Sequence, residues 1–165
     1  MTRLLGLDLG ARRIGLALAD DDGSAAMPLS TLRRGRTLAA DEAAVRTVVE
    51  AEMVDELVVG LPLEASGTEG PQAALTRAWA ASLGERLGIP VTFHDERLTS
   101  HLAEARLGPM KRGRSGGPPS KTQRDAYRAR VDREAAAIIL QDELDTRAGL
   151  RSSTPRTPDP QEISR

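Results

Sequence analysis

Apolar and polar residues alternate along the first part of the chain with the two-residue period of β-strands. In the first strand, Leu5, Leu7 and Leu9 share one face, and Asp8 lies on the opposite face. Tight turns rich in Gly and Asp separate this strand from the next two. Three consecutive strands joined by such turns predict an antiparallel meander. The expected strands span residues 4–9, 14–19 and 27–32.

A helical period replaces this alternation further along the chain. Asp41 is a favourable N-cap for a first helix with an apolar stripe at Ala44, Val45, Val48 and Val49. A second helix is expected to begin at Pro71 and to stop at residues 88–90. Its predicted apolar stripe consists of Leu75, Ala78, Trp79, Leu83 and Leu87.

Two short strands are expected beside these helices, at residues 57–59 and 90–94. A third helix ends near Gly108, a basic Gly-rich loop spans 108–123, and a last helix covers about 125–144. The strand–helix–strand units imply parallel strands joined by right-handed crossovers. The sequence therefore predicts an α/β fold, with a mixed five-stranded sheet and helices on both faces. Residues 1–145 are expected to form one domain, and the Pro-rich segment 146–165 a disordered tail.

Composition narrows the available chemistry. The absence of cysteine excludes disulfides and thiolate chemistry, and His94 and His101 are the only imidazoles, so oxygen ligands and a hard cation are favoured over zinc. The net charge is −1 and the only aromatic residues are Trp79, Phe93 and Tyr127. Recognition of nucleic acid would therefore rest on backbone charge and shape rather than on base stacking. No stretch resembles a membrane span or a signal peptide, so a cytoplasmic location is expected.

Three acidic residues are candidates for a shared site. Asp8 lies within an apolar strand, Glu96 follows the last strand, and Asp132 shares the apolar stripe of the last helix. Each has a simpler explanation when taken alone. Asp8 could bond backbone amides of its turn, Glu96 could bond Thr99, and Asp132 could pair with Arg128. Together, however, they can converge at one end of the sheet.

Converging carboxylates repel one another, and a divalent cation removes that cost. Two Mg²⁺ or Mn²⁺ ions roughly 4 Å apart can activate water and bridge a phosphate. In such a site Asp8 would bridge both ions, and Glu96 and Asp132 would each complete one.

Four segments resemble the YqgF/RuvX family: LGLDLGARRIGLALAD near the start, Gly60-Leu61-Pro62, DERLTS at 95–100, and VDREAAAIILQDEL at 131–144. The resemblance implies the RNase H-like fold and a Mg²⁺- or Mn²⁺-dependent phosphodiesterase. Family assignments divide between processing the 5′ end of pre-16S ribosomal RNA and resolving Holliday junctions. The positions that match the catalytic residues are Asp8, Glu96 and Asp132. Any fourth acid of the RNase H-like type stays unassigned.

Basic residues cluster beside two of these acids. Only two acids, Asp125 and Asp132, interrupt the bases between residues 106 and 133. A solvated charged face would explain the excess, but its position favours contact with phosphates, which positions a substrate without reading its sequence. The candidate nucleic-acid-binding residues are Arg12, Arg13, Thr99, Lys111, Arg112, Arg114, Lys121 and Arg124, and Ser100 could also bond the backbone.

The main hypothesis is a metal-dependent nuclease acting on structured RNA in ribosome maturation, as a monomer or a homodimer. The first alternative is a resolvase of branched DNA, for which symmetric cutting favours a dimer. An actin-like kinase or ATPase also begins with Asp-x-Gly and a turn, but that fold needs two such domains and this chain has room for one. An inactive nucleic-acid-binding relative is disfavoured because all three acids are present.

Overall fold

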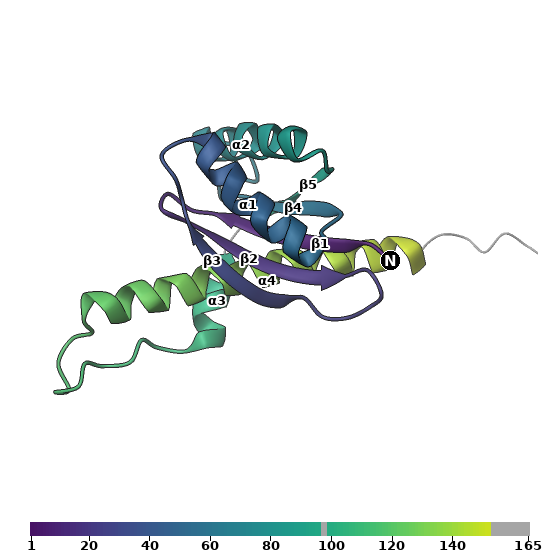
Figure 1. Ribbon diagram of the computed structural model, residues 1–165. Coiled ribbons are helices and arrows are strands. Elements are labelled where there is room, and N and C mark those ends of the chain that lie inside the picture. Colours follow the sequence, from purple (N-terminus) through teal and green to yellow (C-terminus); the bar gives the residue numbers. More distant parts are fainter. Residues whose placement is uncertain (97–98, 153–165) are drawn as a thin grey trace, which may run out of the picture.

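The chain forms a five-stranded mixed sheet in the order β3-β2-β1-β4-β5, with helices on both faces (Figure 1). The computed structural model describes residues 1–96 and 99–152. The strands are β1 (Arg3–Leu9), β2 (Arg13–Asp20), β3 (Met27–Arg33), β4 (Glu56–Leu61) and β5 (Val91–Asp95). The helices are α1 (Leu38–Glu52), α2 (Pro71–Leu87), α3 (Thr99–Leu107) and α4 (Lys121–Ser152). β1, β2 and β3 are antiparallel, and β4 and β5 run parallel to β1. The predicted fold class and element order are confirmed.

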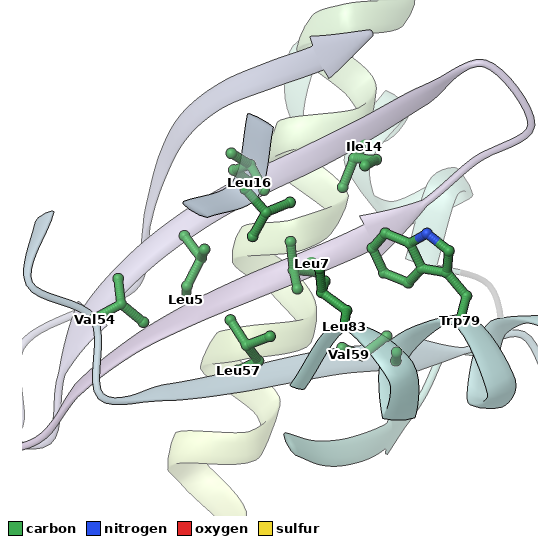
Figure 2. Packing of buried hydrophobic residues seen from close by; sticks show 11 residues of the cluster. Leu5, Leu7, Ile14, Leu16, Val54, Leu57, Val59, Trp79 and Leu83 are labelled. Carbon is green, nitrogen blue, oxygen red and sulfur yellow. The ribbon is translucent and has the colours of Figure 1, made fainter. Parts of the chain in front are cut away.

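One face of the sheet is covered by α1 and α2 (Figure 1). Leu5 and Leu7 point into this layer and pack with Val45 of α1 and with Trp79 and Leu83 of α2 (Figure 2). The alternation of apolar residues in β1 therefore assigns one set of leucines to this core.

The other face is covered by α4, which crosses β1 and β2. Ala136 and Leu140 of α4 pack against Leu4 and Ala17 of the sheet. Asp8 lies on the face of β1 opposite Leu5 and Leu7, as predicted, and the structure shows that α4 covers this face.

Two glycines allow α4 to approach the sheet closely. A Cβ atom at Gly15 of β2 would lie 1.9 Å from the carbonyl oxygen of Asp132, and one at Gly6 of β1 would lie 2.9 Å from that of Ala136. Any side chain at Gly15 would therefore push the helix away. This close contact places Asp132 over β2 at Gly15, the residue that pairs with Asp8 of β1.

The start of α1 differs from the prediction. Thr37, not Asp41, is the N-cap, and its Oγ1 accepts a hydrogen bond from the Ala40 amide at 3.2 Å. Asp41 is instead buried one turn inside the helix, where it accepts from the Gly35 amide and from Nε1 of Trp79. Its carboxylate ties the β3–α1 connection to α2, a long-range role that local sequence does not reveal.

The buried face of α2 also differs from the predicted stripe. Leu75 is 66% exposed and Ala78 is exposed, whereas Ala73 and Thr76 are fully buried. The predictions at Leu75 and Ala78 were therefore wrong. The buried face of α2 therefore combines the small residues Ala73 and Thr76 with Trp79 and Leu83, and Leu75 points to solvent.

α4 is longer than the predicted 125–144 at both ends. It continues through Ser152, so the expected domain boundary at residue 145 falls inside a helix. Arg147 anchors this part by donating from Nε to Glu143 and from Nη1 to Glu56. The Pro-rich part of the expected tail, from residue 153, lies outside the described residues. Within residues 1–96 and 99–152, every helix is too short or too polar to cross a membrane.

Candidate active site

Asp8 is a buried carboxyl near the carboxyl end of the central strand β1. It is 8% exposed, and its register partner in β2 is Gly15. Because Gly15 has no side chain, the backbone of α4 at Asp132 closes over this part of the sheet. The apolar strand, the glycine and the helix together withdraw the Asp8 carboxyl from water.

Glu96 immediately follows β5, at the same end of the sheet. Its amide donates to the carbonyl oxygen of Leu61 at 2.9 Å, which fixes the turn leaving the strand. Its carboxyl lies over Gly60, where a Cβ atom would stand 2.6 Å from the Glu96 Oε2 atom. The glycine of the Gly60-Leu61-Pro62 segment thus provides the space into which Glu96 folds.

The carboxyls of Asp8 and Glu96 meet and share a hydrogen bond. Burial, the largest cause, raises the pKa of both groups. The charge of Asp8 raises the pKa of Glu96 further, and the charge of Asp132 acts in the same direction on Asp8. Two buried acids this close cannot both ionise cheaply, so the pair holds either a proton or a cation.

Asp132 lies on α4 beside this pair but points to a different partner. Its Oδ2 atom accepts a hydrogen bond from Arg13 Nε at 2.6 Å, and both side chains are partly buried. The sequence predicted Arg128 as a possible partner and Arg13 as a phosphate contact. Arg13 and Asp132 are 119 positions apart, so no local spacing could have indicated this ion pair.

The donor set fits a hard divalent cation. Asp8 and Glu96 offer carboxylate oxygens, the ligand type that Mg²⁺ and Mn²⁺ favour. Within the described parts of the chain, however, no group of three or more acidic or histidine side chains is close enough to hold one ion. Asp132 is the separated member, because Arg13 holds its carboxylate. The structure therefore brings the carboxyls of Asp8 and Glu96 together. The carboxylate of Asp132 lies near them but is paired with Arg13.

The predicted basic residues fall into three places, and Arg12 and Arg13 lie at the β1–β2 turn and the start of β2. Lys121 is at the start of α4, whereas Lys111, Arg112 and Arg114 lie in the connection between α3 and α4, which extends away from the sheet (Figure 1). All four are exposed, as is Arg124. Thr99 is only 5% exposed at the first turn of α3, which leaves its hydroxyl little access to a substrate.

Comparison with known proteins identifies the family. A family model described as RuvX, Holliday junction resolvase, matches residues 2–146. A protein of Anaeromyxobacter dehalogenans strain 2CP-1, named as a candidate pre-16S rRNA nuclease, is 48% identical over 146 residues, 88% of this chain and 98% of that protein. A relative with the same name from Moorella thermoacetica is 43% identical over 148 residues, 87% of this chain and 94% of its own. The chain belongs to the RuvX family.

Solved structures agree with the fold of this RuvX-family protein. Thermus thermophilus RuvC superimposes with a TM-score of 0.51 at 14% identity, covering 90% of this chain and 97% of that one. The same protein bound to a Holliday junction substrate gives a TM-score of 0.51 at 16% identity. The RuvX chain therefore has the RNase H-like fold of RuvC and is a nuclease, an enzyme that hydrolyses phosphodiester bonds. Nucleases of the RuvX and RuvC type generally depend on divalent cations.

Proposed function

We propose that this RuvX-family nuclease processes the 5′ end of pre-16S ribosomal RNA, with Asp8, Glu96 and Asp132 as its catalytic residues. The observation that carries the proposal is the buried Asp8–Glu96 pair, held in a chain closely similar to proteins named for this reaction. A paired, water-excluded set of carboxyls has no evident structural benefit, since burying such groups is costly. Its arrangement suits the binding of Mg²⁺ or Mn²⁺.

Each residue of the site has a defined task in this proposal. Asp8 and Glu96 would hold the cations, and Asp132 would join them, while Arg13 orients the Asp132 carboxylate. When bound, the cations supply charge stabilisation at the phosphate and activation of water. Hydrolysis then adds the water oxygen to phosphorus, breaks one P–O ester bond and transfers the water proton to the departing alkoxide. Gly60 keeps the Glu96 carboxyl in reach, and α4 excludes bulk water.

The direct test offers the purified protein precursor 16S rRNA in the presence of Mg²⁺ or Mn²⁺. Asp8→Asn should reduce cleavage at least about a hundredfold, because it removes a central ligand. The variant should melt at the same temperature or higher, since a neutral amide is cheaper to bury than a carboxylate. EDTA should abolish wild-type cleavage. Cleavage that survives EDTA, or that is unchanged in Asp8→Asn, would contradict the assigned roles.

A second candidate function is the resolution of branched DNA. It is favoured by the description of the matching family model and by the RuvC fold, which in Thermus thermophilus RuvC binds a Holliday junction. Single-stranded RNA and a four-way DNA junction therefore belong in the same experiment. Paired, symmetric cuts in the junction by a dimer, with precursor rRNA left intact, would favour the resolvase.

A further inference from the structure

A basic cleft lies beside the proposed catalytic residues, on the β3 side of α4. It encloses about 590 Å³. Its walls are the β1–β2 turn, the end of β3 with the residues that follow it, and the first turns of α4. The charged residues that line it are Arg12, Arg13, Arg33, Arg34, Lys121 and Asp125.

The cleft reaches Asp132, one of the proposed catalytic residues, through Arg13. The same arginine also lines a smaller hollow on the α3 side of α4, together with Asp132 and Arg128. Arg13 therefore stands between the two hollows, with its Nε atom on the Asp132 carboxylate. A polyanion held in the cleft would therefore lie next to the Arg13–Asp132 ion pair.

Three of the cations in the cleft are already compensated. Arg13 is paired with Asp132, and Arg34 donates to the buried carboxylate of Asp41. Lys121 Nζ lies 3.5 Å from Asp125 in the same helix. These pairs hold the walls in place but leave little charge for a ligand.

Arg12 and Arg33 are the uncompensated cations of the cleft. Both are exposed, and neither guanidinium forms a hydrogen bond or ion pair with any residue in the ranges 1–96 and 99–152. Arg33 is also the register partner of Arg13 across the β2–β3 pair, so two like charges face each other on one side of the sheet. Asp132 already offsets the charge of Arg13, so Arg33 is the member of this pair that has no anion among the described residues.

We propose that this basic cleft binds a stretch of phosphodiester backbone separate from the scissile phosphate, with Arg33 and Arg12 as its principal contacts. The ligand follows from the four arginines that line the cleft and from its contact, through Arg13, with the proposed catalytic residue Asp132. The inference rests on the proposed function for its substrate, because only a nucleic acid would occupy both hollows at once. Neither Arg33 nor Arg34 was among the residues predicted from sequence to bind nucleic acid.

Binding of a labelled RNA hairpin to Asp8→Asn protein tests the cleft, because the hairpin is then not cut. Fluorescence anisotropy over a series of KCl concentrations gives the Kd and its salt dependence. Adding Arg33→Gln should raise the Kd about fivefold or more and lower the slope of log Kd against log salt by about 0.7 to 0.9. Adding Arg12→Gln as well should weaken binding further.

Arg36→Gln is the matched control, since Arg36 is an exposed arginine three residues beyond Arg33 that does not line the cleft. It should leave the Kd within about twofold of that of the Asp8→Asn parent. The slope of log Kd against log salt should stay within about 0.2 of the parent's value. Equal melting temperatures for the variants would show that the fold is kept. If Arg33→Gln binds like Arg36→Gln, the cleft is not a backbone site.

The two proposals can fail separately. Wild-type cleavage of precursor rRNA combined with normal binding by Arg33→Gln would remove the cleft and keep the proposed function. Loss of hairpin affinity in Arg33→Gln, with no cleavage of precursor rRNA by the wild type, would keep the cleft and remove the rRNA assignment.

Discussion

At the residue scale, the geometry of the candidate site depends on an absent side chain as much as on the acids. Gly60 leaves the volume that the Glu96 carboxyl occupies, and Ile139 of α4 closes the same volume from above. Both neighbours would stand 2.6 Å from a Cβ atom at this position, well inside van der Waals contact. The glycine in Gly60-Leu61-Pro62 therefore has a specific steric role in placing the carboxyl of Glu96, a proposed catalytic residue.

We expect Gly60→Ala to reduce cleavage more than stability. The added methyl should displace the Glu96 carboxyl from Asp8, and overpacking of this kind costs about 1–3 kcal/mol in stability. Cleavage assayed well below the melting temperature should fall about tenfold or more, because the reacting groups are misplaced.

Gly6→Ala is the control for this prediction. Its Cβ atom would crowd Ala136 and Leu140 on the same face of the sheet, but it does not touch Glu96. Both variants should melt at lower temperature, and only Gly60→Ala should lose activity. Equal loss of activity in the two would mean that α4 docking, and not the placement of Glu96, limits cleavage.

Individual residues also show which features could be predicted from the sequence and which could not. Alternation placed Asp8 on the correct face of β1, because strand periodicity needs only neighbouring residues. Thr37 and Asp41 are both plausible N-caps, and burial against Trp79, which local sequence does not encode, decided between them. The pairing of Arg13 with Asp132 depends on how α4 docks on Gly15, and the hydrogen bond between Asp8 and Glu96 depends on the sheet order. Tertiary contacts of this kind could not be predicted from spacing.

At the element scale, α4 begins earlier than its apolar pattern indicates. The signal that defines its start is a capping box in the segment Ser-Lys-Thr-Gln at 120–123. Ser120 Oγ accepts from the Gln123 amide at 3.1 Å, and Gln123 Oε1 accepts from the Ser120 amide at 2.8 Å. The first turns then extend beyond the sheet (Figure 1), where polar residues suffice and no apolar stripe is needed. A search for caps could have found this boundary.

We expect Ser120→Ala to loosen the first turn of α4 without unfolding the protein. Loss of an N-cap costs about 1 kcal/mol, equivalent to about a fivefold change in the local opening equilibrium. Amide hydrogen exchange at residues 121–125 should therefore accelerate about fivefold. Exchange at the buried residues 135–140 should be unchanged. The control Ser115→Ala, in the preceding loop, should change exchange in neither region. A fall in the global melting temperature of Ser120→Ala would contradict the expectation that only the first turn loosens.

At the scale of the whole molecule, the carboxyl pair makes stability depend on pH. Burial is the main cause that raises the pKa of Asp8 to about 6 and of Glu96 to about 10. A folded state that keeps protons which the unfolded chain releases loses stability as the pH rises. Without divalent cations, the free energy of unfolding should therefore fall between about pH 5 and pH 9, by about 1.4 kcal/mol per pH unit for each proton that only the folded state keeps. The melting temperature should fall with it.

Two comparisons isolate the cause of this pH dependence. Asp8→Asn should reduce it, because the variant loses one of the two acids and an amide can donate a hydrogen bond to the Glu96 carboxylate, although Glu96 stays buried. Mn²⁺ should raise the wild-type melting temperature more at pH 9 than at pH 6, because protons compete less for the carboxyls. A wild-type melting temperature that rises with pH, or an equal cation effect at both values, would contradict the buried pair.

One long helix, α4, connects the basic cleft, the candidate site and the start of β4. α4 carries the start of the basic cleft at Lys121, Asp132 at the candidate site, and an anchor to β4 at Arg147. At about 1.5 Å per residue, Lys121 lies roughly 17 Å along the axis from Asp132. A continuous helix neither stretches nor bends easily over that length, so it keeps the distance between the cleft and the candidate site constant. The position of a cut would then be measured from the bound backbone, by distance rather than by base sequence.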